Sequence, residues 1–174
     1  MKVKSTYIND SSLIRAASPE PDFEDCFTTT FQSDCFLDLE TTVYKYFSAL
    51  SGGWIDALFK LRNILVRPFN LKTPPEESPI KLTYEKIAPG SKVAFFEVLD
   101  VSPTEVLMYI NDSHLNAYLS IDLSQNGKIK TLAASTTVEF NNTIGKVYLA
   151  VIKPFHKLLI KTMLRKVAIE LSKN

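Results

Sequence analysis

The residue in this sequence best placed for chemistry is a histidine within an apolar helical pattern. His156 falls on the same side as Ile160 and Met163 when its segment is drawn at helical spacing. That position turns the imidazole toward the interior, where it could donate a hydrogen bond to a ligand carbonyl or act as a base. The alternative is a half-buried histidine that bonds to the backbone, because buried polar groups are usually hydrogen-bonded.

A second acid–base candidate is Glu97, in an apolar segment that alternates like a strand. If the inner face is the one that carries Phe95 and Leu99, Glu97 points into an apolar space and could act as a general acid. If the inner face is the one that carries Phe96 and Val98, Glu97 points to solvent. The alternation of this segment fits both faces.

The remaining motifs predict structure rather than chemistry. Asp112-Ser113-His114 has the composition of a catalytic triad, but three adjacent residues do not converge on one point, so the motif predicts a turn. Cys26 and Cys35 have neither zinc-site nor redox spacing, and we expect two free thiols. The sequence contains no phosphate-binding loop, nucleotide fingerprint, metal cluster or nucleophile elbow, so it predicts neither a cofactor nor a metal.

The composition predicts a folded protein with a sizeable core. The chain has 174 residues, of which 45% are hydrophobic, and a formal net charge of +1. Acidic residues gather near the N-terminus and basic residues near the C-terminus, a pattern that favours two neighbouring surfaces of one fold over a nucleic-acid site. The chain has no signal-peptide pattern and no apolar stretch long enough for a membrane span, so we expect a soluble, cytoplasmic protein.

The elements that must position these residues follow a definite order. Residues 1–21 lack periodicity and predict a flexible arm, followed by one domain over residues 22–174. A strand over 23–32 comes first, and then a helix over 37–50 with Asp38 as its N-cap. The next helix, over 54–66, is apolar around most of its circumference, and we expect its Trp54 and Leu58 to face the interior.

The second half of the chain predicts an antiparallel sheet and a closing helix. A proline-rich connection over 70–90 is a candidate cavity rim. Four strands follow over 92–101, 105–111, 114–123 and 128–140, and Asn126-Gly127 predicts a hairpin between the last two. The closing helix begins near 142–143 and extends to about 171, and Pro154 should kink or break it.

Three blocks of the sequence carry a resemblance to a known superfamily. They are WIDALFKLRNILVRPFNLK, INDSHLNAYLSIDL and NNTIGKVYLAVIKPFHKLLIKTMLRK. Their order resembles a family of small bacterial proteins without an assigned function, within the START-like superfamily of polyketide cyclases and birch-pollen-type allergens. The resemblance covers about residues 22–168. It implies the α+β helix-grip fold, a curved antiparallel sheet around a long C-terminal helix, and a cavity for an apolar or amphipathic molecule between them. It supplies no catalytic residues that could be carried over to this chain.

Three hypotheses follow for the function. The first is a non-enzymatic binding protein whose partner is a small apolar or amphipathic molecule held in the cavity. We expect this cavity to be lined by Trp54, Leu58, Phe95, Glu97, His156, Ile160 and Met163. The second is a cofactor-independent cyclase, lyase or hydrolase that uses His156 and Glu97 as an acid–base pair. The third is a scaffold filled by its own aromatic side chains, which a pocket below about 300 Å³ would support.

Overall fold

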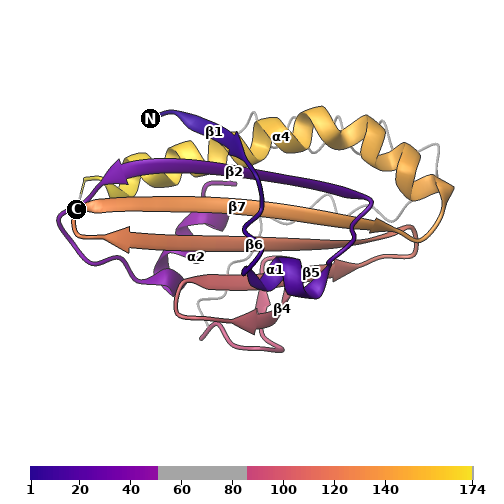
Figure 1. Ribbon diagram of the computed structural model, residues 1–174, viewed down its shortest axis with the longest axis horizontal. Coiled ribbons are helices and arrows are strands. Elements are labelled where there is room, and N and C mark those ends of the chain that lie inside the picture. The colour runs from indigo at the N-terminus through magenta and orange to yellow at the C-terminus, as the bar shows by residue number, and fades with distance from the viewer. Residues whose placement is uncertain (51–85, 174) are drawn as a thin grey trace.

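One curved antiparallel sheet carries most of the structure, a computed structural model that describes residues 1–50 and 86–173 (Figure 1). The strands follow the order β1-β2-β7-β6-β5-β4-β3, and every neighbouring pair is antiparallel. Their bounds are β1 Val3–Thr6, β2 Phe23–Gln32, β3 Lys92–Val93, β4 Phe96–Val101, β5 Glu105–Asn111, β6 Leu115–Asn126 and β7 Ile129–Phe140. The described helices are α1 Leu13–Ala17, α2 Leu39–Ser48 and α4 Thr143–Leu171.

The two faces of the sheet are covered by different helices. Helix α4 packs against β2 and β7 and also contacts α2, so these two helices cover the inner face (Figure 1). The short helix α1 packs against β5, β6 and β7 on the outer face. A curved antiparallel sheet that holds a long C-terminal helix is the helix-grip arrangement, so the predicted α+β fold class is confirmed.

Local sequence signals explain where several elements begin and turn. The Asp38 carboxylate accepts a hydrogen bond from Thr41 N at 2.7 Å, which confirms its predicted role as the N-cap of α2. Between β6 and β7, Asn126 pairs with Ile129, which leaves a two-residue hairpin loop. Gly127 opens that loop with a φ of 56°, in the left-handed region that glycine enters without steric penalty.

The segment predicted as one strand over 92–101 is a hairpin instead. Val93 pairs with Phe96, so β3 and β4 are joined by a two-residue turn of Ala94 and Phe95. Ala94 takes a φ of 57°, in the left-handed region where glycine or asparagine is usually found. The sequence has neither glycine nor asparagine at this turn, so its continuous apolar run gives no indication that the strand ends there.

The N-terminal residues, which the sequence predicts as a flexible arm, contain a strand and a short helix. β1 pairs with the middle of β2, and α1 packs Ile14 against the outer face with none of its surface exposed. The Glu105 carboxylate of β5 accepts hydrogen bonds from Leu13 N at 2.8 Å and Ile14 N at 3.4 Å. Since these two backbone groups at the start of α1 have no intrahelical acceptor, a long-range carboxylate fixes a helix that its own sequence barely specifies.

Helix α4 is continuous through Pro154, where the sequence predicts a kink or break. The Asn142 side chain caps its first turn by accepting from Gly145 N at 3.2 Å. The predicted apolar arc is confirmed, because buried side chains recur along the second half of the helix: Ile160, Met163, Leu164, Val167 and Leu171. The predicted helix over 54–66 and most of the connection over 70–90 lie outside the described residues.

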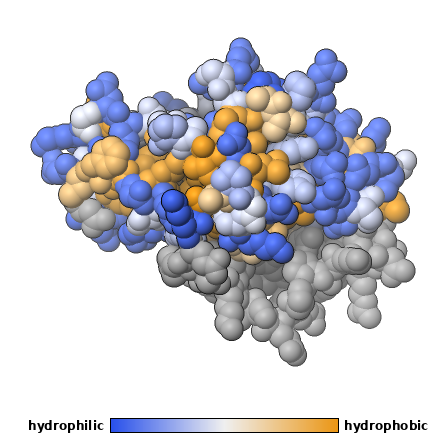
Figure 2. Space-filling model, turned by 90° about the horizontal axis from the view of Figure 1, so that it is seen from below, coloured by the Kyte–Doolittle hydropathy of each residue, from blue (hydrophilic) through white to orange (hydrophobic). Residues whose placement is uncertain are grey.

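The surface of the described part is mixed rather than uniformly polar. Figure 2 shows apolar side chains gathered at the centre of one face, with hydrophilic ones around them. Large apolar side chains that are exposed include Phe36, Phe95 and Leu158. Within the residues that the structure describes, no helix combines the length and the apolar character needed to cross a membrane.

Candidate functional site

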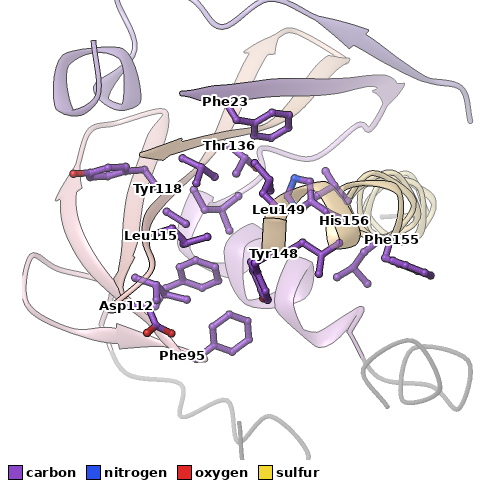
Figure 3. Close-up of a pocket in the computed structure, with 18 of the residues that line it drawn as sticks. Phe23, Phe95, Asp112, Leu115, Tyr118, Thr136, Tyr148, Leu149, Phe155 and His156 are labelled. Atoms are coloured by element: carbon purple, nitrogen blue, oxygen red, sulfur yellow. The ribbon is translucent and has the colours of Figure 1, made fainter. Parts of the chain in front are cut away.

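A cavity of about 570 Å³ lies between the inner face of the sheet and helices α2 and α4 (Figure 3). Carbon dominates its wall, which draws on α2, the strands β2 and β4 to β7, and α4. The apolar lining includes Phe23, Phe47, Leu50, Phe96, Ile110, Leu115, Leu119, Val138, Leu149, Ile152 and Leu159. The volume falls within the range of small-molecule sites and exceeds the roughly 300 Å³ below which a filled scaffold is favoured.

The structure brings four of the predicted lining residues to this wall. Phe95, His156, Ile160 and Met163 all border the cavity. Phe95 comes from the turn between β3 and β4 and is 49% exposed, so it sits at an edge of the cavity rather than in its depth. Two further predicted lining residues, Trp54 and Leu58, lie outside the described residues.

Glu97 is not part of the cavity, and this prediction is corrected. Val98 is 1% exposed and Phe96 borders the cavity, whereas Glu97 between them is exposed. Because successive side chains of a strand point to opposite faces, the inner face of β4 is the one that carries Phe96 and Val98. The turn at Ala94 and Phe95 separates the two halves of the segment, so Phe95 says nothing about which face Glu97 takes. His156 and Glu97 therefore do not form an acid–base pair at this cavity.

His156 is instead paired with Asp25 of β2. Its Nε2 lies 3.3 Å from Asp25 Oδ1, and the two side chains are 19% and 7% exposed. The imidazole also meets the Phe23 ring edge-on, with 6.5 Å between ring centroids (Figure 3). The pair joins the sheet to the helix across 131 residues of chain. It replaces the backbone contact that the sequence left open as an alternative.

Two hydroxyl groups of the cavity wall accompany this pair. Thr136 stands directly opposite Asp25 in the register of β2 and β7, and both Thr136 and the fully buried Tyr46 border the cavity. Burial, and secondarily the charge of Asp25, raise the pKa of Tyr46, so its hydroxyl keeps its proton. Tyr46 Oη, Thr136 Oγ1 and Asp25 Oδ2 have no hydrogen-bond partner among the described residues.

A second aspartate–histidine pair borders the same cavity at the start of β6. His114 Nδ1 lies 3.3 Å from Asp112 Oδ1, and both residues line the cavity. The two atoms are close enough for an ion pair, but the N–H direction does not meet the oxygen well enough for a hydrogen bond. The His114 ring packs edge-on against Tyr148 of α4, with 4.8 Å between centroids.

The electrostatics of this second pair favour an ionised carboxylate. Partial burial raises the pKa of Asp112, but three neighbouring groups outweigh that effect: Ser113 N at 2.6 Å, Ser113 Oγ at 3.1 Å and the His114 imidazole. The net result is a pKa below the ordinary value of an aspartate. Asp112 is therefore negatively charged at neutral pH and stands beside the buried ring.

Sequence reasoning missed Asp25 as a partner and His114 as a lining residue, for different reasons. The alternation of the first strand places Asp25 on the same face as Phe23 and Phe27. It does not indicate which residue of the helix packs against that face. His114 directly precedes β6, and continuing the alternation of β6 back to His114 would point its side chain to the outer face of the sheet. The bend at 113–114 interrupts this alternation, and no sequence signal shows which way a side chain at a bend will point.

Residues 17–163 match the model of a family described as a protein of unknown function, DUF2867. The chain belongs to this family. The predicted membership of a family without an assigned function is thereby confirmed. No curated protein matches the chain.

Solved structures with a similar fold share little sequence with this chain. A conserved protein from Geobacillus kaustophilus has 17% identity and a TM-score of 0.41, with 87% of this chain and 96% of that one covered. Protein Ms6760 from Mycobacterium smegmatis has 9% identity and a TM-score of 0.49, with coverages of 87% and 91%. CalU16 from Micromonospora echinospora has 11% identity and a TM-score of 0.37, with coverages of 86% and 84%.

Proposed function

We propose that this protein binds a small, largely apolar molecule in the cavity between the sheet and α4. The observation that carries the proposal is the volume of about 570 Å³ lined by a wall made mainly of carbon. Such a wall gains free energy by removing ligand carbon from water, at roughly 25 cal/mol per Å². A ligand that buries about 250 Å² would gain about 6 kcal/mol before the cost of its immobilisation.

The same geometry argues for a binding protein over the other two hypotheses. The volume exceeds the limit set for a scaffold filled by its own side chains. The acid–base pair of His156 and Glu97 is not assembled, because Glu97 is exposed on the far face of β4. His156 is bonded to Asp25, a contact that holds the sheet and the helix together.

The test begins with native mass spectrometry of the purified protein and extraction of any molecule that co-purifies. The protein is then titrated with 2-methylnaphthalene, a neutral probe of suitable size, by calorimetry. Ala117 of β6 lines the cavity, so Ala117→Phe should fill part of it and weaken binding at least about ten-fold. Ala150→Phe is the matched control, because Ala150 is exposed on α4 and should leave the affinity unchanged.

Two results would count against the proposal. One is a wild-type protein that carries no co-purified molecule and binds no apolar probe. The other is an Ala117→Phe variant that folds normally and binds the probe as tightly as the wild type, since the probe would then sit elsewhere.

A further inference from the structure

We propose that His114 is the polar anchor of the cavity and selects an apolar ligand that carries a hydroxyl group. The inference rests on the proposed function and deepens it by naming the ligand class. Its basis is a buried imidazole that borders the cavity beside a carboxylate that fixes which of its nitrogens carries the proton.

The His114 side chain has unused hydrogen-bonding capacity in an environment where such capacity is rarely left unused. The residue is 5% exposed, and neither ring nitrogen has a well-aligned partner among the described residues. Buried polar groups in native proteins are bonded in the large majority of cases. An unbonded imidazole on the wall of a cavity is therefore a group whose partner comes from the cavity.

The neighbouring carboxylate determines what that partner must offer. Asp112 Oδ1 lies 3.3 Å from His114 Nδ1, so a lone pair on this nitrogen would face negative charge. The proton therefore resides on Nδ1 in the neutral ring, and Nε2 presents a lone pair. The complementary ligand group is a hydrogen-bond donor.

The anchor is held in place from both sides. Asn141 N donates to His114 O at 3.1 Å, and Asn141 Nδ2 donates to Asp112 O at 2.8 Å. Asn142 Nδ2 donates to Ser113 O at 3.1 Å, and the same side chain caps α4. Gly145 of α4 lies so close to the turn that a Cβ there would come within 2.2 Å of the His114 carbonyl oxygen. A turn fixed in this way can present its ring at one position, as selective recognition requires.

The charges along the wall distinguish a hydroxyl from a carboxylate or an ammonium group. Among the described residues that line the cavity, none is lysine or arginine, while Asp112 is there to repel an anion. An ammonium group is disfavoured because burying a charge against a wall made mainly of carbon is costly. A neutral hydroxyl avoids both penalties and can donate to Nε2.

The experiment uses four naphthalenes that differ in one group: 2-methylnaphthalene, 2-naphthol, 2-naphthoate and 2-naphthylmethylammonium. Calorimetry at pH 7 should show that wild-type protein binds 2-naphthol roughly ten-fold more tightly than 2-methylnaphthalene, by one buried hydrogen bond. The two ions should bind more weakly than either neutral probe.

Variants then assign the preference to one side chain. His114→Phe and His114→Leu should bind 2-naphthol and 2-methylnaphthalene equally, with the affinity for 2-methylnaphthalene kept within about three-fold. Thr136→Val is the matched control, because Thr136 also borders the cavity with an unbonded hydroxyl and should leave the preference intact. Two His114 variants are used so that a folding failure in one leaves the other.

The outcomes separate this inference from the proposed function. If wild-type protein binds no probe, the cavity proposal fails and the anchor fails with it. If 2-methylnaphthalene binds but 2-naphthol gains nothing, only the anchor is overturned. A preference that survives both His114 variants, or that Thr136→Val removes, overturns it too. Tightest binding of either ion would show that the wall selects charge instead.

Discussion

Two aspartate–histidine pairs each contribute their histidine to the wall of the same cavity, and they are built in opposite ways. Asp25 and His156 are 131 residues apart and meet only because the sheet and α4 pack together. Asp112 and His114 are two residues apart and meet in a turn. In both pairs the nitrogen and oxygen are separated by 3.3 Å, so distance alone does not distinguish them.

The difference lies in what each histidine has left to offer. His156 uses Nε2 to bond Asp25, which gives a buried carboxylate a hydrogen-bond partner and joins two elements of the core. His114 has no aligned bond on either nitrogen within the described part of the chain. The first pair is accordingly a structural contact and the second a recognition group. A histidine beside an aspartate acquires its role from its remaining nitrogen and not from the pair itself.

The largest expected effect comes from making the same substitution in both pairs. His156→Phe should lower the free energy of unfolding by about 3 kcal/mol, because it leaves the Asp25 carboxylate buried without a partner. His114→Phe should change it by less than about 1 kcal/mol, because it removes unbonded nitrogens and keeps a ring against Tyr148. Urea unfolding at pH 7 measures both values.

A double variant checks the reason for that difference. Asp25→Asn combined with His156→Phe removes the buried charge and should recover most of the lost stability. Equal losses in the two single variants would show that the pairs are equivalent after all. An unrecovered double variant would place the cost in packing against Phe23 rather than in the charge.

The second prediction breaks the turn pair while sparing the other. A glycine-to-alanine change inside a helix usually stabilises by about 1 kcal/mol. At Gly145 the added Cβ would collide with the backbone carbonyl of His114, so Gly145→Ala should destabilise by about 2 kcal/mol and weaken the preference for 2-naphthol.

Lys146→Ala, at the exposed neighbouring position, serves as the control for Gly145→Ala. Thermal unfolding and the 2-naphthol titration report the two effects separately. A stable Gly145→Ala protein with unchanged selectivity would show that the turn does not need its tight contact with α4.

The smallest effect concerns pH and tests whether Asp112 is ionised in the folded protein. Its folded-state pKa is lowered, so its contribution to stability is present above the ordinary aspartate pKa and is lost as pH falls below about 4. Because the group is only partly buried and water screens its interactions, we expect only a few tenths of a kcal/mol. Asp112→Asn should remove this acid-side slope in unfolding experiments between pH 2.5 and pH 5.

The carboxylate of Asp122 titrates in an overlapping pH range, and its effect on stability has the opposite sign to that of Asp112. Asp122 therefore has to be replaced first. Burial, then the neighbouring Glu105, raises the pKa of Asp122 to about 6. A raised aspartate pKa means that stability falls as pH rises from about 4 to about 6, here by about 1 kcal/mol after allowance for screening by water. The Asp112 experiment therefore belongs in an Asp122→Asn background. An acid-side slope that Asp112→Asn leaves unchanged in that background would mean that the Asp112 carboxylate has no favourable partner.

Much of the fold could be predicted because periodicity reports which face of an element is buried. The bounds of β2 and β5, the cap of α2 and the apolar arc of α4 follow from local pattern alone. The hairpin at Ala94 could not be predicted, because alanine gives no sign of a left-handed turn. Helix α1 could not either, because Glu105 holds its first turn from 91 and 92 residues away.

The features of the site also divide into those set by local sequence pattern and those set by tertiary packing. The sequence by itself determined that His156, Ile160 and Met163 share one helical face and that this face is buried, since helical spacing is a local property. Only the tertiary structure decided that Asp25 meets His156, that Glu97 points outward and that His114 turns inward. Each of these depends on how separate elements pack or where a turn reverses the alternation of faces, and residue spacing does not encode either one.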